Sequence, residues 1–241
     1  MRSPAEVTPG YVYVPDLKAA GALIDLSPEE THYVARVCRA RAGDCVTAAD
    51  GRGRIATLRL VQRGPRVAAH VESVASCAPR TPAWVLSGPP EGQRADWLVE
   101  KLGELGIERW QPIDCERAGW DRHAARQERW HRIAVAAMKQ SRSAFLLEIA
   151  EPVPLRAALR ALPAGASRWL ARQDGPPPSR LQGEPAVVVV GPSSGLSEAE
   201  TDALSAEGFK PIRLAECRLR TETAAMAWAA WWASISGTPS A

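Results

Sequence analysis

The most informative part of this 241-residue sequence is an apolar run followed by a Gly-bearing turn, Val187-Val188-Val189-Val190-Gly191-Pro192-Ser193-Ser194-Gly195-Leu196-Ser197. The four valines predict a strand buried on both faces, as in the centre of a parallel sheet. Gly191 and Gly195 predict a tight turn that lets a ligand approach the backbone. Ser197-Glu198-Ala199-Glu200 has the pattern of a capping box, so a helix should follow. This order places the turn at the carboxyl edge of the sheet, where ligands of α/β folds bind.

A second stretch repeats the arrangement. Ile212–Leu214 is a short apolar strand candidate, and Arg218-Leu219-Arg220-Thr221-Glu222-Thr223 leads from it into a tail helix predicted over 223–234. Turns after adjacent parallel strands meet at one edge of a sheet, so we expect the two turns to lie side by side. Together they could enclose an adenosyl group by backbone contacts. Taken alone, the first turn could equally be a plain tight turn without a ligand.

The rest of residues 83–241 alternates between strands and helices, which predicts an α/β domain with a parallel sheet. Gly106 should end the first helix in the left-handed conformation. The tail tryptophans are more typical of core or subunit packing than of ligand binding. The expected strands are Ala83–Leu86, Ile107–Ile113, Phe145–Ile149, Trp169–Ala171 and Ala186–Val190, and the expected helices are Arg94–Leu105 and Ala124–Arg142.

Residues 1–75 have a different pattern, which predicts a small β-barrel domain before the Pro-punctuated boundary at 76–82. A hairpin signal stands at Asp50-Gly51-Arg52-Gly53. One helix should begin after Ser27, with Glu30 completing a capping box, and should run to about residue 40. The expected strands are Tyr11–Val14, Ile55–Val61 and Val67–Val74.

Basic residues recur on that helix. His32, Arg36 and Arg39 are spaced to share one face, and Arg41 follows just beyond. The face is either RNA-facing or merely solvated. The net charge of +3 permits a nucleic-acid partner without requiring one.

Several classes of protein and site are disfavoured. Five scattered cysteines without a C-x-x-C pair argue against a disulfide framework or a zinc site, and we expect no metal. The chain has no apolar signal segment at its start and no apolar run of the length that spans a bilayer. We therefore expect a soluble cytoplasmic protein without a membrane partner.

The two turns resemble a known family. Gly191-Pro192-x-x-Gly195-Leu196-Ser197-x-x-Glu200, followed by the Arg218–Ala224 segment R-L-R-T-E-T-A, is similar to the RsmE family of SPOUT methyltransferases. Those enzymes methylate N3 of a uridine in 16S ribosomal RNA, using S-adenosylmethionine. The resemblance extends along nearly the whole chain, through His32–Arg39, Glu100–Ile107 and Ala136–Ser141.

This resemblance implies a fold and a set of sites. We expect a PUA-like RNA-binding barrel over 1–75 and a SPOUT domain with a deep trefoil knot over 83–241, forming a homodimer through the knotted domain. The partner would be 16S rRNA in the small ribosomal subunit. Arg220 and Arg218, then Arg142, are the catalytic candidates, and RNA would contact Arg2, His32, Arg36, Arg39 and Arg41. The methyl donor would be bound by Leu170, Gly191, Pro192, Ser193, Ser194, Gly195, Leu196, Leu214, Leu219, Thr221 and Thr223.

The chain departs from the family pattern at the donor loop. The usual G-P-E-G-G turn reads Gly191-Pro192-Ser193-Ser194-Gly195, and the usual arginine after Q-S-G is Ser143, with Arg142 one place earlier. Two alternatives therefore stand beside the methyltransferase. One is a SPOUT-fold RNA-binding protein with weakened or lost methyl transfer, and the other is a methyltransferase for another RNA.

Overall fold

The computed structural model describes residues 7–63, 66–121, 124–178 and 184–235. These residues form two compact units. The first unit contains the described residues up to Pro79 together with Met138–Leu146, and the second contains Arg80–Ala137 and the described residues from Leu147 onward. The expected boundary at 76–82 includes the change of unit. Residues 138–146, which the sequence pattern assigned to the second domain, instead pack with the first, because Met138 clusters with Tyr11 and the Tyr11 hydroxyl donates to the Ser143 carbonyl at 2.9 Å.

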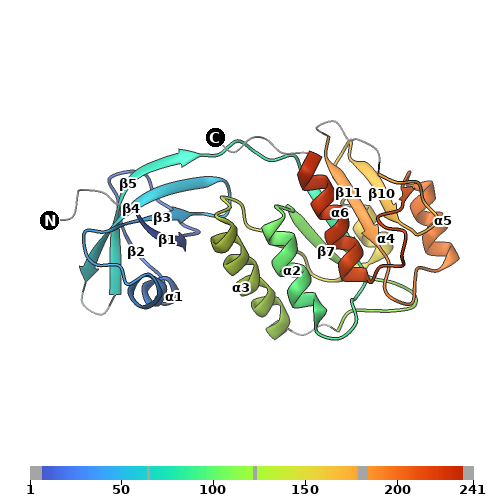
Figure 1. Cartoon of the computed structure of the whole chain (residues 1–241), viewed down its shortest axis with the longest axis horizontal. Helices are drawn as coiled ribbons and strands as arrows, with labels where there is room; N and C mark the ends of the chain where they lie inside the picture. Colours follow the sequence, from blue (N-terminus) through green and yellow to red (C-terminus); the bar gives the residue numbers. More distant parts are fainter. Residues whose placement is uncertain (1–6, 64–65, 122–123, 179–183, 236–241) are drawn as a thin grey trace. The chain divides into compact units, whose positions relative to one another are not determined.

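The first unit is built on a five-stranded sheet whose spatial order is β1-β3-β4-β5-β2 (Figure 1). β1 pairs with β3 in parallel, and the other neighbours are antiparallel. The predicted hairpin is confirmed between β3 and β4, where the Asp50 carboxylate accepts the backbone N–H groups of Arg52 and Arg54 at 2.7 and 3.0 Å. The strands are β1 (Val7–Tyr13), β2 (Leu23–Asp25), β3 (Cys45–Ala49), β4 (Arg54–Arg63) and β5 (Arg66–Ser76).

The predicted continuous helix is wrong beyond His32. The chain forms a short helix α1 (Pro28–His32) and then a π-helix η1 (Tyr33–Val37), so the predicted sharing of one face by Arg36 and Arg39 does not hold. Ser27 does cap α1 by accepting the Glu30 N–H at 3.2 Å.

The Glu30 carboxylate binds elsewhere, which leaves the predicted capping box at Ser27 incomplete. It accepts two hydrogen bonds from Lys139 Nζ, each 2.8 Å long, and that ammonium also lies 3.8 Å from the centre of the Tyr33 ring. Tertiary packing of Tyr33 and of the buried Val34 thus outweighs the local helical pattern.

The second unit contains a parallel sheet with the order β12-β10-β11-β6-β7-β8, and β9 pairs with β7. The expected Phe145–Ile149 strand shortens to its last two residues, because the Phe145 ring packs against Gly53 in the first unit. The strands are β6 (Ala83–Ser87), β7 (Arg109–Asp114), β8 (Glu148–Ile149), β9 (Val153–Pro154), β10 (Ser167–Ala171), β11 (Ala186–Val190) and β12 (Lys210–Ile212).

Helices cover both faces of this sheet. Leu155 and Ala158 of α4 and Leu204 of α5 join one apolar cluster with the strands, while α2 and α6 lie on the opposite face, as Figure 1 shows for α6 in front and α4 behind. Every residue of β11 is buried, as the valine run predicted. Among the described residues, none of the helices is long and apolar enough to cross a membrane. The helices are α2 (Arg94–Glu104), α3 (Ala124–Ser141), α4 (Leu155–Leu159), α5 (Glu198–Ala206) and α6 (Thr221–Ile235).

Candidate functional site

A pocket of about 1040 Å³ opens at the carboxyl ends of β10, β11 and β12. Ligands of parallel α/β sheets bind at this carboxyl edge, beyond the ends of the strands. The lining includes these residues that the sequence predicted: Leu170, Gly191, Pro192, Ser193, Ser194, Gly195, Leu196, Leu214, Arg218, Leu219, Arg220 and Thr221.

The first turn is shaped by its glycines and by the helix that follows. Gly195 has a φ of +76°, which suits glycine, and its N–H donates to the Pro192 carbonyl at 2.9 Å. The predicted capping box is confirmed: the Glu200 N–H donates to Ser197 Oγ at 3.1 Å, and the Ser197 N–H donates to the Glu200 carboxylate at 2.8 Å. The turn is therefore fixed at both ends.

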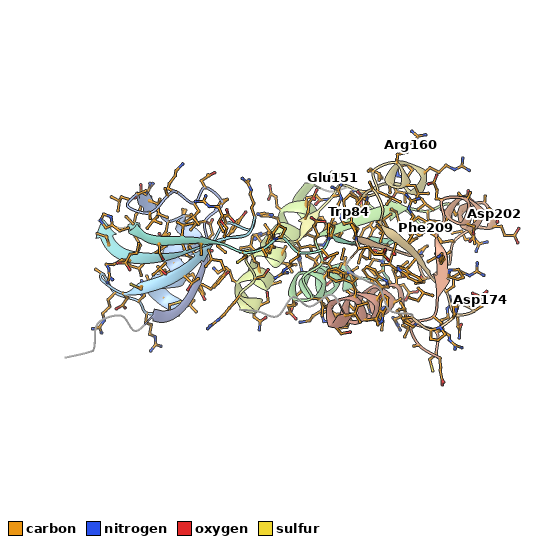
Figure 2. All side chains as sticks on the ribbon, turned by 90° about the horizontal axis from the view of Figure 1, so that it is seen from above. Trp84, Glu151, Arg160, Asp174, Asp202 and Phe209 are labelled. Carbon is orange, nitrogen blue, oxygen red and sulfur yellow. The ribbon has the colours of Figure 1, made fainter. Side chains whose placement is uncertain are left out.

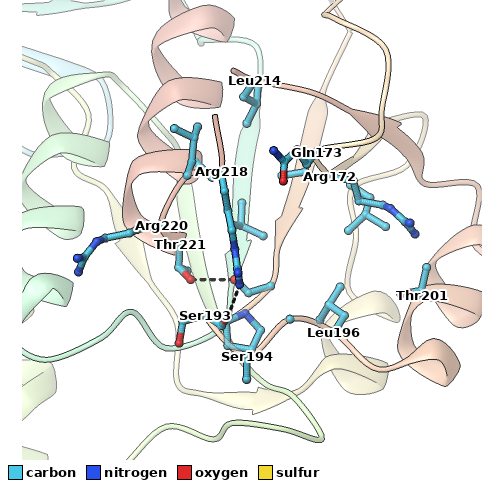
Figure 3. Close-up of a pocket in the computed structure, with 18 of the residues that line it drawn as sticks. Arg172, Gln173, Ser193, Ser194, Leu196, Thr201, Leu214, Arg218, Arg220 and Thr221 are labelled. Carbon is cyan, nitrogen blue, oxygen red and sulfur yellow. Dashed lines mark hydrogen bonds between the residues drawn. The ribbon is translucent and has the colours of Figure 1, made fainter. Parts of the chain in front are cut away.

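The second turn lies against the first, as predicted. Thr221 Oγ1 donates to the Gly191 carbonyl at 2.9 Å, and Arg218 Nη2 donates to the Ser193 carbonyl at 2.9 Å (Figure 3). Thr221 is buried, whereas Arg218 is exposed. Two hydrogen bonds over 25 to 30 residues of sequence separation thus join the turns into one wall of the pocket.

A third segment, the loop after β7, supports the first turn and was not predicted. Arg117 Nη1 donates to the Ser194 carbonyl at 3.3 Å, and the Glu116 N–H donates to the Glu200 carboxylate at 2.8 Å. Glu200 is nearly buried and so bridges two loops through backbone N–H groups. Nothing in the local sequence around Arg117 signals this contact, because it joins residues 77 positions apart.

Charged side chains surround the pocket. Arg220 lies 3.6 Å from Glu91, and Figure 3 shows its side chain directed away from the pocket centre. Arg172, another lining residue, pairs with Asp174, and this hydrogen-bonded pairing raises the pKa of Arg172 and lowers that of Asp174. Glu198 and Asp202 also line the pocket, so among the described residues its charges of the two signs are nearly balanced.

Glu222 does not line the pocket. Its buried carboxylate lies 3.3 Å from Arg94 Nε, at the start of α2. An ion pair therefore accounts for this buried carboxylate.

Two other predicted site residues lie outside the lining. Thr223 is on α6 but does not line the pocket, and Arg142 belongs to the first unit, just after α3. Arg142 has a φ of +53°, an uncommon conformation for a residue with a side chain. Their assigned roles stay predictions.

The predicted RNA-contacting residues lie in the first unit. His32, Arg36, Arg39 and Arg41 are exposed, and Arg39 has a φ of +51°. Arg2 lies outside the described residues. Within the described ranges, no group of three or more His, Cys, Asp or Glu side chains is arranged to hold a metal ion.

Comparison with known proteins places this geometry in a family. The RNA methyltransferase domain family matches residues 78–233, which is more than half of the chain. The chain belongs to this family. Its match includes both turns, the loop after β7 and the whole pocket lining.

Two relatives of this chain have the same name. A protein called ribosomal RNA small subunit methyltransferase E from Mycobacterium bovis is 29% identical, over 88% of this chain and 87% of the relative. A protein of the same name from Aquifex aeolicus is 36% identical over 54% of this chain and 58% of its own length. The resemblance to the RsmE family is thereby confirmed.

Solved structures of proteins with related names have a fold similar to that of this chain. Ribosomal RNA small subunit methyltransferase E from Neisseria gonorrhoeae, bound to S-adenosylmethionine, has a TM-score of 0.85 and 26% identity, covering 94% of this chain and 97% of the other. A probable rRNA methyltransferase from Porphyromonas gingivalis has a TM-score of 0.83 and 28% identity, covering 94% and 98%.

Proposed function

We propose that this chain transfers a methyl group from S-adenosylmethionine to N3 of a uridine in the 16S rRNA of the small ribosomal subunit. The observation that carries the proposal is the pocket formed by two hydrogen-bonded turns at the carboxyl ends of β10, β11 and β12, in a member of an RNA methyltransferase family. The Neisseria relative, which spans nearly the whole chain, binds this donor.

The pocket fits such a donor. Its volume of about 1040 Å³ is at the upper end of the range that pockets for small ligands and cofactors have, so the donor can be accommodated. Apolar side chains, Leu170, Leu196 and Leu214, line it beside exposed backbone groups of the turns. Such a mixed surface suits an adenine ring and the hydrogen-bonding edges of an adenosyl group. The donor supplies an activated methyl carbon when it is bound.

The arginines of the second turn have a role in the acceptor reaction. N3 of uracil must release its proton, to solvent water, before or as it accepts the methyl group, and negative charge develops on the base at that point. Arg218 and Arg220 both line the pocket. In this proposal Arg218 stabilises that charge, and Arg220, whose side chain is directed away from the pocket centre towards Glu91, contributes only when it leaves that carboxylate. Arg218 also holds the Ser193 carbonyl, so it couples charge stabilisation to the shape of the donor turn. We keep Arg142 as a further catalytic candidate from the sequence.

RNA is held by the first unit in this proposal. The family resemblance assigns that unit a PUA-like barrel, and His32, Arg36, Arg39 and Arg41 present four exposed basic side chains on it. Their contacts would go to phosphates, which position the RNA without reading its sequence. Recognition of the target would then depend on RNA shape and on unpaired bases.

We also propose the family's knot and homodimer. A Cβ added at Gly175 would lie 2.7 Å from the Ile212 nitrogen, and the Arg213 N–H donates to the Pro176 carbonyl at 2.8 Å. The segment after β10 therefore lies directly against the end of β12, as the crossing of a knot requires. Trp97 on α2 is 45% exposed, and large exposed aromatics are typical of subunit interfaces.

The deciding experiment measures methyl transfer to small ribosomal subunits. Subunits from a strain that lacks the gene are incubated with the purified protein and labelled donor, and the rRNA is mapped by mass spectrometry. We expect one N3-methyluridine in 16S rRNA. A label on transfer RNA alone would favour the methyltransferase for another RNA. Absence of donor binding in a calorimetric titration at millimolar concentration would favour an RNA-binding protein without methyl transfer.

A further inference from the structure

The first unit contains a second pocket, of about 760 Å³. α1 and η1 form one wall and the first residue of β5 contributes to the other. Among the described residues of its lining, three side chains are basic and none is acidic. The lining residues are Leu26, Pro28, Thr31, His32, Ala35, Arg36 and Arg66.

The two arginines of this pocket are available to a ligand. Both are exposed, and within the described part of the chain neither guanidinium group has an ion pair or a hydrogen bond. Other arginines of the same unit are engaged: Arg59 binds Glu72, and Arg54 donates to the Leu17 carbonyl at 2.8 Å. Arg36 and Arg66, which have no partner among the residues that the structure describes, therefore share one pocket that attracts an anion.

The floor of the pocket is apolar. Leu26 is only 4% exposed, and the exposed Pro28 and Ala35 add further aliphatic surface to the lining. A ligand that fits must therefore offer a flat apolar face and an anionic group within the length of one pocket. An unpaired nucleotide has this combination, because its base presents a ring face next to a phosphate.

We propose that this second pocket binds one unpaired nucleotide of the RNA substrate, with its base against Leu26, Pro28 and Ala35 and its phosphate between Arg36 and Arg66. The inference rests on the proposed function for the identity of the RNA. It adds Arg66 as an RNA-contacting residue. The sequence did not point to Arg66, because it stands thirty positions after Arg36 in a strand and only the fold brings both residues to one pocket.

The test is the binding of a fluorescein-labelled single-stranded oligouridylate of about six nucleotides to the full chain, followed by anisotropy. S-adenosylhomocysteine is kept saturating so that the donor pocket does not contribute. Arg36→Ala and Arg66→Ala are compared with Arg160→Ala, a matched loss of charge at an exposed arginine after α4 that projects from the surface (Figure 2). Arg36→Lys retains the charge, and thermal melting verifies that each variant is folded.

We expect each pocket variant to weaken binding. When the salt concentration is raised from about 50 to about 200 mM, the affinity of each pocket variant should fall by a factor about three times smaller than the factor for the unsubstituted protein, because one phosphate contact is gone. Arg160→Ala should leave both quantities unchanged.

Three results would overturn the proposal: unchanged binding by Arg36→Ala and Arg66→Ala, an equal loss with Arg160→Ala, or equally strong competition by a poly-glutamate peptide. Methyl transfer is scored separately. A chain that binds oligouridylate through Arg36 and Arg66 but transfers no methyl group would contradict the proposed function and leave the pocket standing. Methyl transfer to 16S rRNA together with unaltered oligouridylate binding in both variants would support the proposed function and contradict the nucleotide pocket.

Discussion

Replacement of Thr221 by valine tests whether the hydrogen bond between the two turns maintains the donor pocket. Thr221 Oγ1 donates to the Gly191 carbonyl at 2.9 Å, and this partly buried bond is the less exposed of the two that join the turns. Valine has nearly the same shape and a similar helix propensity, so the start of α6 should be undisturbed. Thr221→Ser retains the hydroxyl and is the matched control.

The size of the effect follows from the burial of both partners. A fully buried carbonyl left without a donor costs about 1–3 kcal/mol, but Gly191 is only half-buried, so water replaces part of the lost bond and about 1 kcal/mol remains. If that free energy favours the arrangement that binds the donor, the competent fraction falls and the apparent Kd rises by up to about fivefold.

Calorimetric titration with S-adenosylmethionine measures the Kd, and urea unfolding measures the loss of stability. We expect Thr221→Val to be weaker by a few-fold in donor binding and less stable by about 1 kcal/mol. Thr221→Ser should have nearly the same Kd and the same free energy of unfolding as the unsubstituted protein. A Thr221→Val protein with the original Kd would refute the reasoning, because the two turns would then hold the pocket without their shared, partly buried bond.

Three further predictions concern other contacts. Burial raises the pKa of the Cys115 thiol to about 12 from its ordinary value of about 9, so the stabilising effect of the neutral thiol is present below pH 9 and is lost as the pH rises towards 12. The stability of the unsubstituted protein relative to Cys115→Ser should therefore fall over that range in urea titrations. Lys139→Met leaves the buried Glu30 carboxylate without its partner and should cost about 3 kcal/mol in urea unfolding, part of which Glu30→Gln should restore in the double variant. Ser193→Ala and Ser194→Ala should change donor affinity less than about twofold in calorimetry, because the strong contacts of these residues run through backbone carbonyls; a tenfold loss would contradict this account.

The strand at the centre of the sheet could be predicted because its own residues carry the whole signal. β-branched side chains at Val187 to Val190 favour a strand, and their uninterrupted apolar character requires cover on both faces, which the structure provides. The capping box at Ser197 is equally local, since both of its hydrogen bonds join residues three apart. Local spacing is not sufficient by itself, because the box predicted at Ser27 has the same spacing but the Glu30 carboxylate binds the distant Lys139 instead.

Other features depend on contacts between distant residues. The π-helix at Tyr33–Val37 lies beside Lys139, over 100 positions away, and no local pattern signals that partner. Residues 138–146 join the first unit for the same kind of reason, through Tyr11. Arg117 and Arg66 were missed as site residues because the fold, and not the spacing, brings each of them to a pocket.

The serines of the donor loop illustrate why a departure from a family pattern need not disturb a site. The carbonyl of Ser193 accepts from Arg218 and the carbonyl of Ser194 accepts from Arg117, and a carbonyl is present whatever the side chain. Replacing the family's glutamate and glycine therefore leaves these two bonds in place. What the replacement removes is a carboxylate beside two arginines, while Glu91 still places one near Arg220 on the opposite rim. The shape of the loop is thus retained, and its local charge becomes more positive, which favours an anionic substrate such as RNA.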